Sequence, residues 1–260
     1  MNIPETYNQL DQWTTVMFLY NSALKAINTK IEILNNEFIH LYNYNPIEHI
    51  KSRLKTPESI VKKLKRGGHE VTIPNMIEHL SDIAGIRIIC SFSPDIYRIA
   101  EMIARQSDVT VLVVKDYIKN PKPNGYKSYH MVVTIPIYLS DGPVDTKVEI
   151  QIRTLAMNFW AVIEHSLQYK YKEHMPEHIR QRLSASSDAI VQLDNEMSQI
   201  RDEILDSQNL IRKKDRLVSE ILNLIHNLYR VANKREVLTI QDEFYKVYQQ
   251  GDISMLEKFL

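Results

Sequence analysis

The sequence predicts a domain of mixed α and β structure (α/β, or α+β), in which a mixed, largely antiparallel sheet is flanked by helices and followed by a helical tail. Apolar residues recur at helical spacing near both ends of the chain, whereas the middle changes to β-rich segments. Two of these segments flank Ser140-Asp141-Gly142-Pro143, a composition typical of a hairpin turn. With 260 residues, 44% of them hydrophobic, the chain can fill a sizeable core.

The first element is a mostly helical and acidic region over residues 1–50, which has two basic and five acidic side chains. Apolar residues recur there at helical spacing: Ile27, Ile31, Leu34 and Phe38. Pro46 ends the region, because proline cannot continue a helix. The charge then inverts, since residues 51–66 hold seven basic side chains and only one acidic one.

The middle of the chain supplies the strands. They are predicted over residues 86–90, 109–114, 126–139 and 144–154, with a helix over residues 96–105 between the first two. Helical spacing returns over residues 155–171, continues from residue 176 past 204, and ends in a tail that Gly251 interrupts before a short last helix. We therefore expect an N-terminal helical region (1–50), a central domain (51–205) and a helical C-terminal extension (206–260). The sequence assigns the extension no role beyond packing or assembly.

Charge and cysteine content exclude several classes of protein. Lys+Arg and Asp+Glu are both 32, so binding to nucleic acid or membrane through the overall field is not expected, and any basic site must be local. The single cysteine, Cys90, excludes an intramolecular disulfide and a Cys-rich zinc site. Neither a signal peptide nor a membrane span is recognisable. We expect a cytoplasmic protein with no membrane association.

The six glycines exclude two common phosphate-binding loops. None of them is spaced as G-x-G-x-x-G or as G-x-x-x-x-G-K-[ST], so neither a Rossmann turn nor a Walker A loop is present. If the protein handles nucleotides, side-chain cations must hold the phosphates.

A short basic helix is the first candidate for that task. Thr56 and Pro57 form a helix-start signature, and Gly67-Gly68 ends the helix. The helical period places a hydroxyl and several cations on one face: Ser59, Lys62, Lys63 and Arg66. Arg53 and Lys55 lie just upstream. A solvated charged face is the alternative, but such faces usually mix both signs, and like charges repel unless an anion such as polyphosphate relieves them.

Acidic and polar residues on the strands form the second candidate. Asp82 precedes a buried strand, where a carboxylate can position Mg²⁺, although a turn aspartate is the alternative. Arg87, inside that strand, needs an acid, a phosphate or a flat partner. Alternation over residues 148–153 places Glu149, Gln151 and Arg153 on one face of a strand.

The preceding strand adds an aromatic ring and a histidine. Tyr126 and His130 share one of its faces, with Lys122 in the loop before it, and hairpin pairing would bring His130 near Gln151. An exposed sheet face is the alternative to a nucleotide site, in which the tyrosine ring would stack on a base. Asp82 and Glu149 are hard oxygen ligands for Mg²⁺, and phosphoryl-type transfer depends mostly on positioning and charge stabilisation.

Several motifs in fixed order resemble the synthetase domain of the RelA/SpoT family. They are Arg53-x-Lys55-x3-Ser59-Ile60-x2-Lys63, Asp82-Ile83-Ala84-Gly85-Ile86-Arg87, Gly125-Tyr126-Lys127-Ser128-Tyr129-His130 and Glu149-Ile150-Gln151-Ile152-Arg153-Thr154. Residues 156–165 resemble the single-domain branch, the small alarmone synthetases of RelP/RelQ type, and residues 46–49 and 119–125 are similar to the RelP side. The resemblance covers roughly residues 15–205 and implies a nucleotidyltransferase-like synthetase domain.

The resemblance implies an activity and a role for each matching residue. The family transfers the β,γ-pyrophosphate of ATP to the 3′-hydroxyl of GDP or GTP, which gives ppGpp or pppGpp and AMP. The implied ATP-binding residues are Arg53, Lys55, Ser59, Lys63, Arg66 and Arg87. The implied GDP/GTP-binding residues are Lys122, Tyr126, His130, Gln151 and Asn158. Asp82 and Glu149 would hold Mg²⁺, and Glu149 would also take the proton of the 3′-hydroxyl.

Further properties follow from the same resemblance. The chain has no His-Asp dipeptide and no room for the hydrolase domain of the long members, so we expect synthesis without hydrolysis. A homotetramer is expected, as in the small members. His49 replaces an aromatic residue that helps RelQ-type members to bind allosteric pppGpp, and this puts that regulation in doubt. Two alternatives remain open: a toxic relative that pyrophosphorylates the 3′ end of tRNA, and a non-catalytic module that binds RNA through residues 51–66.

Overall fold

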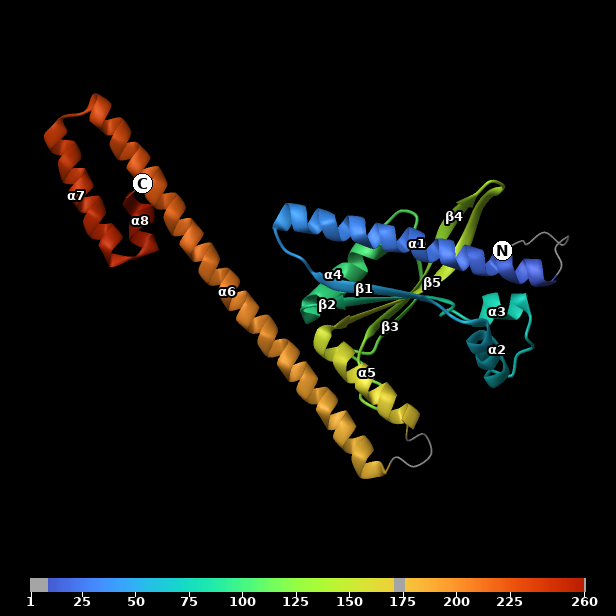
Figure 1. The fold of residues 1–260 in the computed structure, drawn as a ribbon. Coiled ribbons are helices and arrows are strands. Elements are labelled where there is room, and N and C mark those ends of the chain that lie inside the picture. Colours follow the sequence, from blue (N-terminus) through green and yellow to red (C-terminus); the bar gives the residue numbers. More distant parts are fainter. Residues whose placement is uncertain (1–8, 171–175, 260) are drawn as a thin grey trace. The chain divides into compact units, whose positions relative to one another are not determined.

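The structure is a computed structural model that describes residues 9–170 and 176–259 (Figure 1). Its internal contacts divide the chain into two compact units, residues 1–198 and residues 199–260. The first unit contains the sheet, and the second is helical. Helix α6 (Glu177–Val231) contributes to both units.

The first unit is a five-stranded sheet with helices. Its elements are α1 (Gln9–Tyr42), β1 (Ile47–Leu54), α2 (Pro57–Arg66), α3 (Ile73–His79), β2 (Ala84–Cys90), α4 (Ser93–Ala104), β3 (Thr110–Asp116), β4 (Tyr129–Leu139), β5 (Gly142–Thr154), α5 (Leu155–Lys170) and the first part of α6. The strand order is β1-β2-β5-β4-β3, and only β2 and β5 run parallel. The prediction of a mixed, largely antiparallel sheet flanked by helices is confirmed.

Strand alternation gives the sheet one apolar and one polar face. Ile86 and Ile88 of β2 and Ile150 and Ile152 of β5 are almost or completely buried, because they point into the main core. Helix α1 covers this face with a row of apolar side chains: Val16, Leu19, Tyr20, Ala23, Ile27 and Ile31. The residues between the apolar ones in β2, β5 and β4 therefore point to the opposite face.

Several predicted boundaries differ from the structure. The sequence placed a helical region up to residue 50, but β1 follows Pro46 directly, and a boundary at 50 falls inside this strand. Its apolar residues, Ile47, Ile50 and Leu54, are spaced three and four apart as in a helix, so the segment lacks the alternation by which a strand is recognised. Strand β4 begins at Tyr129 rather than Tyr126, because residues 126–128 form part of a loop. Helix α3 was not predicted, and the predicted end at Tyr171 lies outside the described residues.

The second unit consists of helices packed on one another. The predicted helix after residue 176 and the predicted tail are one continuous helix, α6, so the predicted boundary at 205 falls inside it. A break at residues 232–233 separates α6 from α7 (Lys234–Gln250). Gly251, with φ of 73°, then ends α7 before α8 (Ile253–Phe259), as predicted. The unit's core contains Ile221, Ile225, Val237, Phe244 and Leu256.

Among the helices that the structure describes, none combines the length and the apolar character that a membrane crossing requires.

Candidate active site

A cavity of about 640 Å³ lies over the polar face of the sheet. Nine of the thirteen predicted site residues line it: Arg53, Lys63, Asp82, Arg87, Lys122, Tyr126, His130, Glu149 and Gln151. They come from β1, α2, β2, β4, β5 and the connecting loops. Positions up to 98 residues apart in the sequence are thus brought to one cavity.

Strand register explains how the central residues meet. Parallel pairing of β2 with β5 sets Gly85 opposite Glu149 and Arg87 opposite Gln151. Antiparallel pairing of β4 with β5 sets His130 opposite Gln151. Side chains at paired positions share one face of a sheet. The side chains at the four positions other than Gly85 therefore lie over the same face. The prediction that His130 lies near Gln151 is confirmed by this register.

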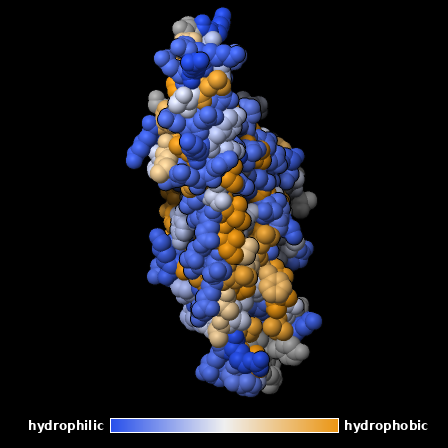
Figure 2. Space-filling model, turned by 90° about the vertical axis from the view of Figure 1, so that its left-hand side faces the viewer, coloured by the Kyte–Doolittle hydropathy of each residue, from blue (hydrophilic) through white to orange (hydrophobic). Residues whose placement is uncertain are grey.

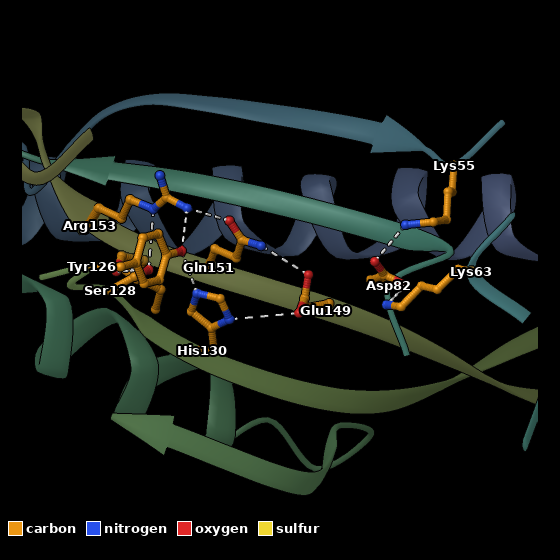
Figure 3. A network of polar contacts seen from close by, with 10 residues as sticks. Lys55, Lys63, Asp82, Tyr126, Ser128, His130, Glu149, Gln151 and Arg153 are labelled. Carbon is orange, nitrogen blue, oxygen red and sulfur yellow. Dashed lines mark hydrogen bonds and ion pairs between the residues drawn. The ribbon is translucent and has the colours of Figure 1, made fainter. Parts of the chain in front are cut away.

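The cationic end of the cavity is built around Asp82. Its carboxylate forms ion pairs with Lys55 Nζ at 2.7 Å and with Lys63 Nζ at 2.8 Å (Figure 3). Burial alone would raise the pKa of Asp82, but the hydrogen bonds and charges of the two lysines outweigh it and hold this pKa below its ordinary value. Asp82 is therefore ionised at neutral pH.

Helix α2 places Lys63 at this position. The Thr56 side chain caps the helix by accepting a hydrogen bond from the Ser59 backbone N–H, as the sequence predicted. Ile60 and Leu64 are completely buried, which anchors one face of the helix in the core and directs Lys63 toward the cavity.

The other end of the cavity is a network of polar contacts around Arg153 (Figure 3). Arg153 Nη2 donates hydrogen bonds to Tyr126 Oη at 2.6 Å and to Gln151 Oε1 at 2.8 Å. Gln151 Nε2 donates in turn to Glu149 Oε2 at 3.0 Å, and Tyr126 Oη lies 2.8 Å from His130 Nε2. Arg153 was placed on this face by strand alternation, but no site role was predicted for it. Its central position depends on its hydrogen bonds and on its burial, and the sequence shows neither.

Burial and the neighbouring side chains set the protonation states of Glu149 and His130. Burial lowers the pKa of His130 below its ordinary value, so its imidazole is neutral at neutral pH. Burial would raise the pKa of Glu149, but the contacts with His130 and Gln151 outweigh it and hold this pKa below its usual range. Glu149 Oε1 lies 3.7 Å from His130 Nδ1. The site therefore presents an ionised carboxylate beside a neutral imidazole.

Aromatic rings and a lysine form the outer wall of this end. Lys122 Nζ lies 4.7 Å from the ring centre of Tyr117 and 4.8 Å from that of Tyr126. Arg153 also contacts the Tyr126 ring, at 5.1 Å from its centre. Tyr117 was not predicted, and a single tyrosine after a strand gives no signal in the sequence.

A smaller cavity of about 270 Å³ adjoins the cationic end and shares four lining residues with the main cavity: Arg53, Arg87, Glu149 and Gln151. Gly85 also lines it, and a side chain at this position would meet Arg53 Cγ at 3.7 Å. Two guanidinium groups thus border a small space with a glycine floor. Such planes can stack on a flat heterocycle.

Four predicted residues do not line the main cavity. Lys55 reaches the site through Asp82, as described above. Ser59 lies in the first turn of α2, where its hydroxyl accepts a hydrogen bond from Thr56 Oγ1 at 3.0 Å. Arg66 is exposed at the last position of α2, and Asn158 lies on α5 with a buried Oδ1 that has no hydrogen-bond partner in the described part of the chain.

Helix α6 holds the loop that carries Tyr126. Ser187 Oγ donates a hydrogen bond to the carbonyl oxygen of Gly125, and Lys127 Nζ donates to Ser187 Oγ at 3.0 Å and to Asp188 Oδ1 at 2.8 Å. Gly125 has φ of 88°, and a Cβ there would lie 3.1 Å from Ser184 Cα. This contact of α6 with the loop was not predicted, because about 60 residues separate its partners.

The donor set of the cavity fits a magnesium ion. Asp82 and Glu149 line the same cavity, and both are held ionised. The negative charge of Asp82 is a minor influence on the pKa of Glu149 and opposes its net lowering, so the two carboxylates interact across the cavity. Hard oxygen ligands under mutual repulsion are stabilised by a divalent cation.

Comparisons with known proteins agree with this geometry. The family profile described as "Region found in RelA / SpoT proteins" matches residues 52–174. The GTP pyrophosphokinase YwaC of Bacillus subtilis is 43% identical over 195 residues, which cover 75% of this chain and 93% of YwaC. The chain belongs to the RelA/SpoT family. Another relative, the GTP pyrophosphokinase YjbM of the same organism, is 41% identical over 78% of this chain and 95% of its own length.

Solved structures of RelA/SpoT family members share the fold of this chain. The small alarmone synthetase 2 of Bacillus subtilis matches with a TM-score of 0.67 and 42% identity, and covers 74% of this chain and 98% of its own. The small alarmone synthetase 1 of that organism, bound to its product pppGpp, also has a TM-score of 0.67, with 40% identity over 74% of this chain and 98% of its own. The predicted membership of this family and its small alarmone synthetase branch is confirmed.

The contact of α6 with the Tyr126 loop makes a prediction about stability. Replacing Gly125 by alanine should lower the free energy of unfolding, because the new Cβ meets backbone at 3.1 Å and the positive φ is strained. Gly142→Ala is the matched control, since Gly142 also has a positive φ but nothing lies within 4 Å of its added Cβ. Urea unfolding should show a loss for Gly125→Ala that exceeds that of the control by about 1–3 kcal/mol, the usual cost of inserting a group into packed surroundings. Equal losses would show that α6 does not confine the loop.

The protonation states make a second prediction. The His130 side chain should titrate below the ordinary histidine pKa of 6.5, because burial disfavours the imidazolium. Glu149 raises the pKa of His130, so Glu149→Gln should move this titration to still lower pH. Imidazole chemical shifts followed by NMR against pH would measure both values, with His130→Asn used to assign the signal. A titration that moves to higher pH in Glu149→Gln would contradict the geometry.

Proposed function

We propose that this chain is a GTP/GDP pyrophosphokinase, which transfers the β,γ-pyrophosphate of ATP to the 3′-hydroxyl of GDP or GTP and forms ppGpp or pppGpp and AMP. The observation that carries this proposal is the composition of the main cavity. It has lysines and arginines at one end, and an ionised glutamate, a neutral histidine and aromatic rings at the other. The names of YwaC and YjbM, both GTP pyrophosphokinases, support it.

The cationic end is suited to the donor nucleotide. Arg53 and Arg87 border the smaller cavity, where the adenine would lie between guanidinium planes. Lys55 and Lys63 lie beside Asp82 and would neutralise the phosphates. Ser59, near the start of α2, and Arg66, at its end, would add further phosphate contacts. A solved structure of small alarmone synthetase 1 bound to AMPCPP, 38% identical to this chain, supports an adenine nucleotide ligand.

The aromatic end is suited to the acceptor nucleotide. The Tyr126 ring is held on one edge by Arg153 and His130, so its position is fixed before a guanine stacks on it. Lys122, next to this ring, would contact the acceptor phosphates together with His130. Gln151 is oriented by Arg153 and Glu149, which leaves it suited to position the ribose, and Asn158 would approach from α5.

Glu149 belongs to the aromatic end of the cavity and lies on its side toward Asp82 (Figure 3). Its ionised carboxylate can accept the proton of the 3′-hydroxyl as that oxygen attacks the β-phosphorus of ATP. Gln151 and His130 hold the carboxylate in place. Since the attacking group comes from the acceptor nucleotide, the protein needs to supply positioning and charge rather than a nucleophile of its own.

Asp82 and Glu149 would hold the magnesium ion. When bound, Mg²⁺ neutralises charge on the phosphate oxygens and on the developing transition state. The homotetramer and the cytoplasmic location expected from the sequence stay predictions, as does the effect of His49 on allosteric regulation, and RNA binding stays an alternative.

The product of the reaction tests the proposal. Purified protein with ATP, GDP and Mg²⁺ should give AMP and ppGpp, measured by anion-exchange chromatography, and Glu149→Gln should lower the rate about 100-fold or more, with an unchanged circular dichroism spectrum. ADP as the product, or no product, would overturn the proposal. Label transferred from ATP to tRNA but not to GDP would identify the alternative acceptor, and RNA binding without any transfer would identify a non-catalytic module.

The donor end makes a separate prediction about substrate affinity. Lys63→Met should raise the KM for ATP about 10-fold or more with a smaller effect on the KM for GDP, because it removes a desolvated charge–phosphate contact. Lys62→Met is the matched control, since Lys62 is the neighbouring residue of the same helix but is exposed and does not line the cavity. Steady-state kinetics with each nucleotide varied in turn would measure both constants. Equal effects of the two substitutions would contradict the assignment of Lys63.

A further inference from the structure

Helix α6 carries an apolar seam with a seven-residue repeat. Apolar residues occupy most positions of a repeat with alternating spacings of three and four, which is the pattern of a coiled coil, and Ser207 and Lys214 are the polar exceptions. In heptad notation, the a positions of the second unit are Ile204, Ile211, Val218 and Ile225, and the d positions are Ile200, Ser207, Lys214, Ile221 and Leu228. The same spacing extends toward the start of the helix through Met197 and Leu193. The matched region of the family profile ends at residue 174, before this seam.

The C-terminal half of the seam is covered within the chain. Ile221 and Ile225 are buried against α7 and α8, with Val218 and Leu228 packed beside them. Lys214 lies on the ring of Tyr248, 5.1 Å from its centre. The seam therefore works as a helix-packing surface from residue 214 onward.

The preceding part of the seam is exposed. Ile200, Ile204 and Ile211 are 41%, 52% and 58% exposed, and no described residue packs over them in either hydrophobic cluster. Leu210, at a g position, widens this apolar surface on one margin. The face of the molecule drawn in Figure 2 shows apolar side chains gathered in a band among polar ones. Apolar surface that continues a packing seam is a typical mark of an interaction site.

We propose that residues 200–211 of α6 pair with the same segment of a second copy of this chain, in parallel and in register, as a two-stranded coiled coil. A heptad seam fits another helix with the same repeat, because the knobs of one fill the holes of the other. The second unit has ten basic and ten acidic residues, so its charge gives no attraction for nucleic acid.

Charges beside the seam favour the parallel orientation. In a parallel pair, the g position of one helix faces the following e position of the other. Glu196 of one copy would then face Arg201 of the other, in addition to the bond that Arg201 forms with Asp202 in its own chain. In an antiparallel pair centred on Ile200 and Ile204, Glu203 would face Glu203 of the other copy. Like charges at such close range oppose that arrangement.

Cysteine cross-linking of the full chain tests this pairing. The single native cysteine, Cys90, is completely buried, so introduced thiols can be read without interference from it. Ser207→Cys lies at a d position, where identical residues meet in a parallel, in-register pair. Diamide, which oxidises two thiols to a disulfide, should convert most of this variant into a covalent dimer. Asn209→Cys is the matched control, since Asn209 is also exposed but lies at the f position, on the far side of the helix.

The possible results separate the proposal from its rivals. Cross-linking of Ser207→Cys well above that of Asn209→Cys supports it. Equal cross-linking of the two, or none, overturns it, and so does a disulfide that forms only between Met197→Cys and Ser207→Cys chains, which indicates antiparallel pairing. Ile204→Asp with Ile211→Asp should also lower the molar mass seen by light scattering, whereas Asn209→Asp should not. These readouts are independent of nucleotide transfer, so failure here and failure of the proposed function are distinguishable.

Discussion

The site depends on one pairing in the sheet, the parallel ladder between β2 and β5. These strands are about 60 residues apart in the chain, yet their register sets Gly85 opposite Glu149 and Arg87 opposite Gln151. The same register buries Ile86 and Ile88 beside Ile150 and Ile152 on the other face. Because side chains alternate along a strand, a slip of one residue would move the polar set into the core. The apolar core therefore fixes the positions of the polar residues in the cavity.

Electrostatics then divides this polar face into two environments. At one end, Asp82 is kept ionised by two lysines, and at the other Glu149 is kept ionised beside a neutral His130. Both carboxylates line the same cavity, but lysines surround Asp82, whereas a histidine and a glutamine surround Glu149. This difference lets one cavity distinguish a phosphate-rich ligand from a ligand that presents a base and a hydroxyl.

Local patterns in the sequence predicted much of the fold and most of the site. Alternation placed Glu149, Gln151 and Arg153 on one face, and the Thr56–Pro57 signature placed the start of α2, because both depend only on neighbouring residues. What could not be predicted depends on distant contacts. The parallel partner of β2, the central position of buried Arg153, and the hydrogen bonds of Ser187 and Asp188 to the Tyr126 loop appear only when separate segments pack. Strand β1 was missed because its apolar residues have helical spacing and do not alternate.

The two ion pairs of Asp82 have a consequence for how ligands enter. The positive charges of Lys55 and Lys63 beside Asp82 oppose the approach of a metal cation, and lysines engaged by a carboxylate have less to offer to phosphates. Nucleotide phosphates that draw the ammonium groups away would free the oxygens of Asp82, and a cation that occupies those oxygens would release the lysines. By thermodynamic reciprocity, each ligand then strengthens the binding of the other to the same degree. Asp82 thus serves as the counterion of the two lysines in this structure, and a metal–nucleotide complex would supply opposite charges to both partners at once.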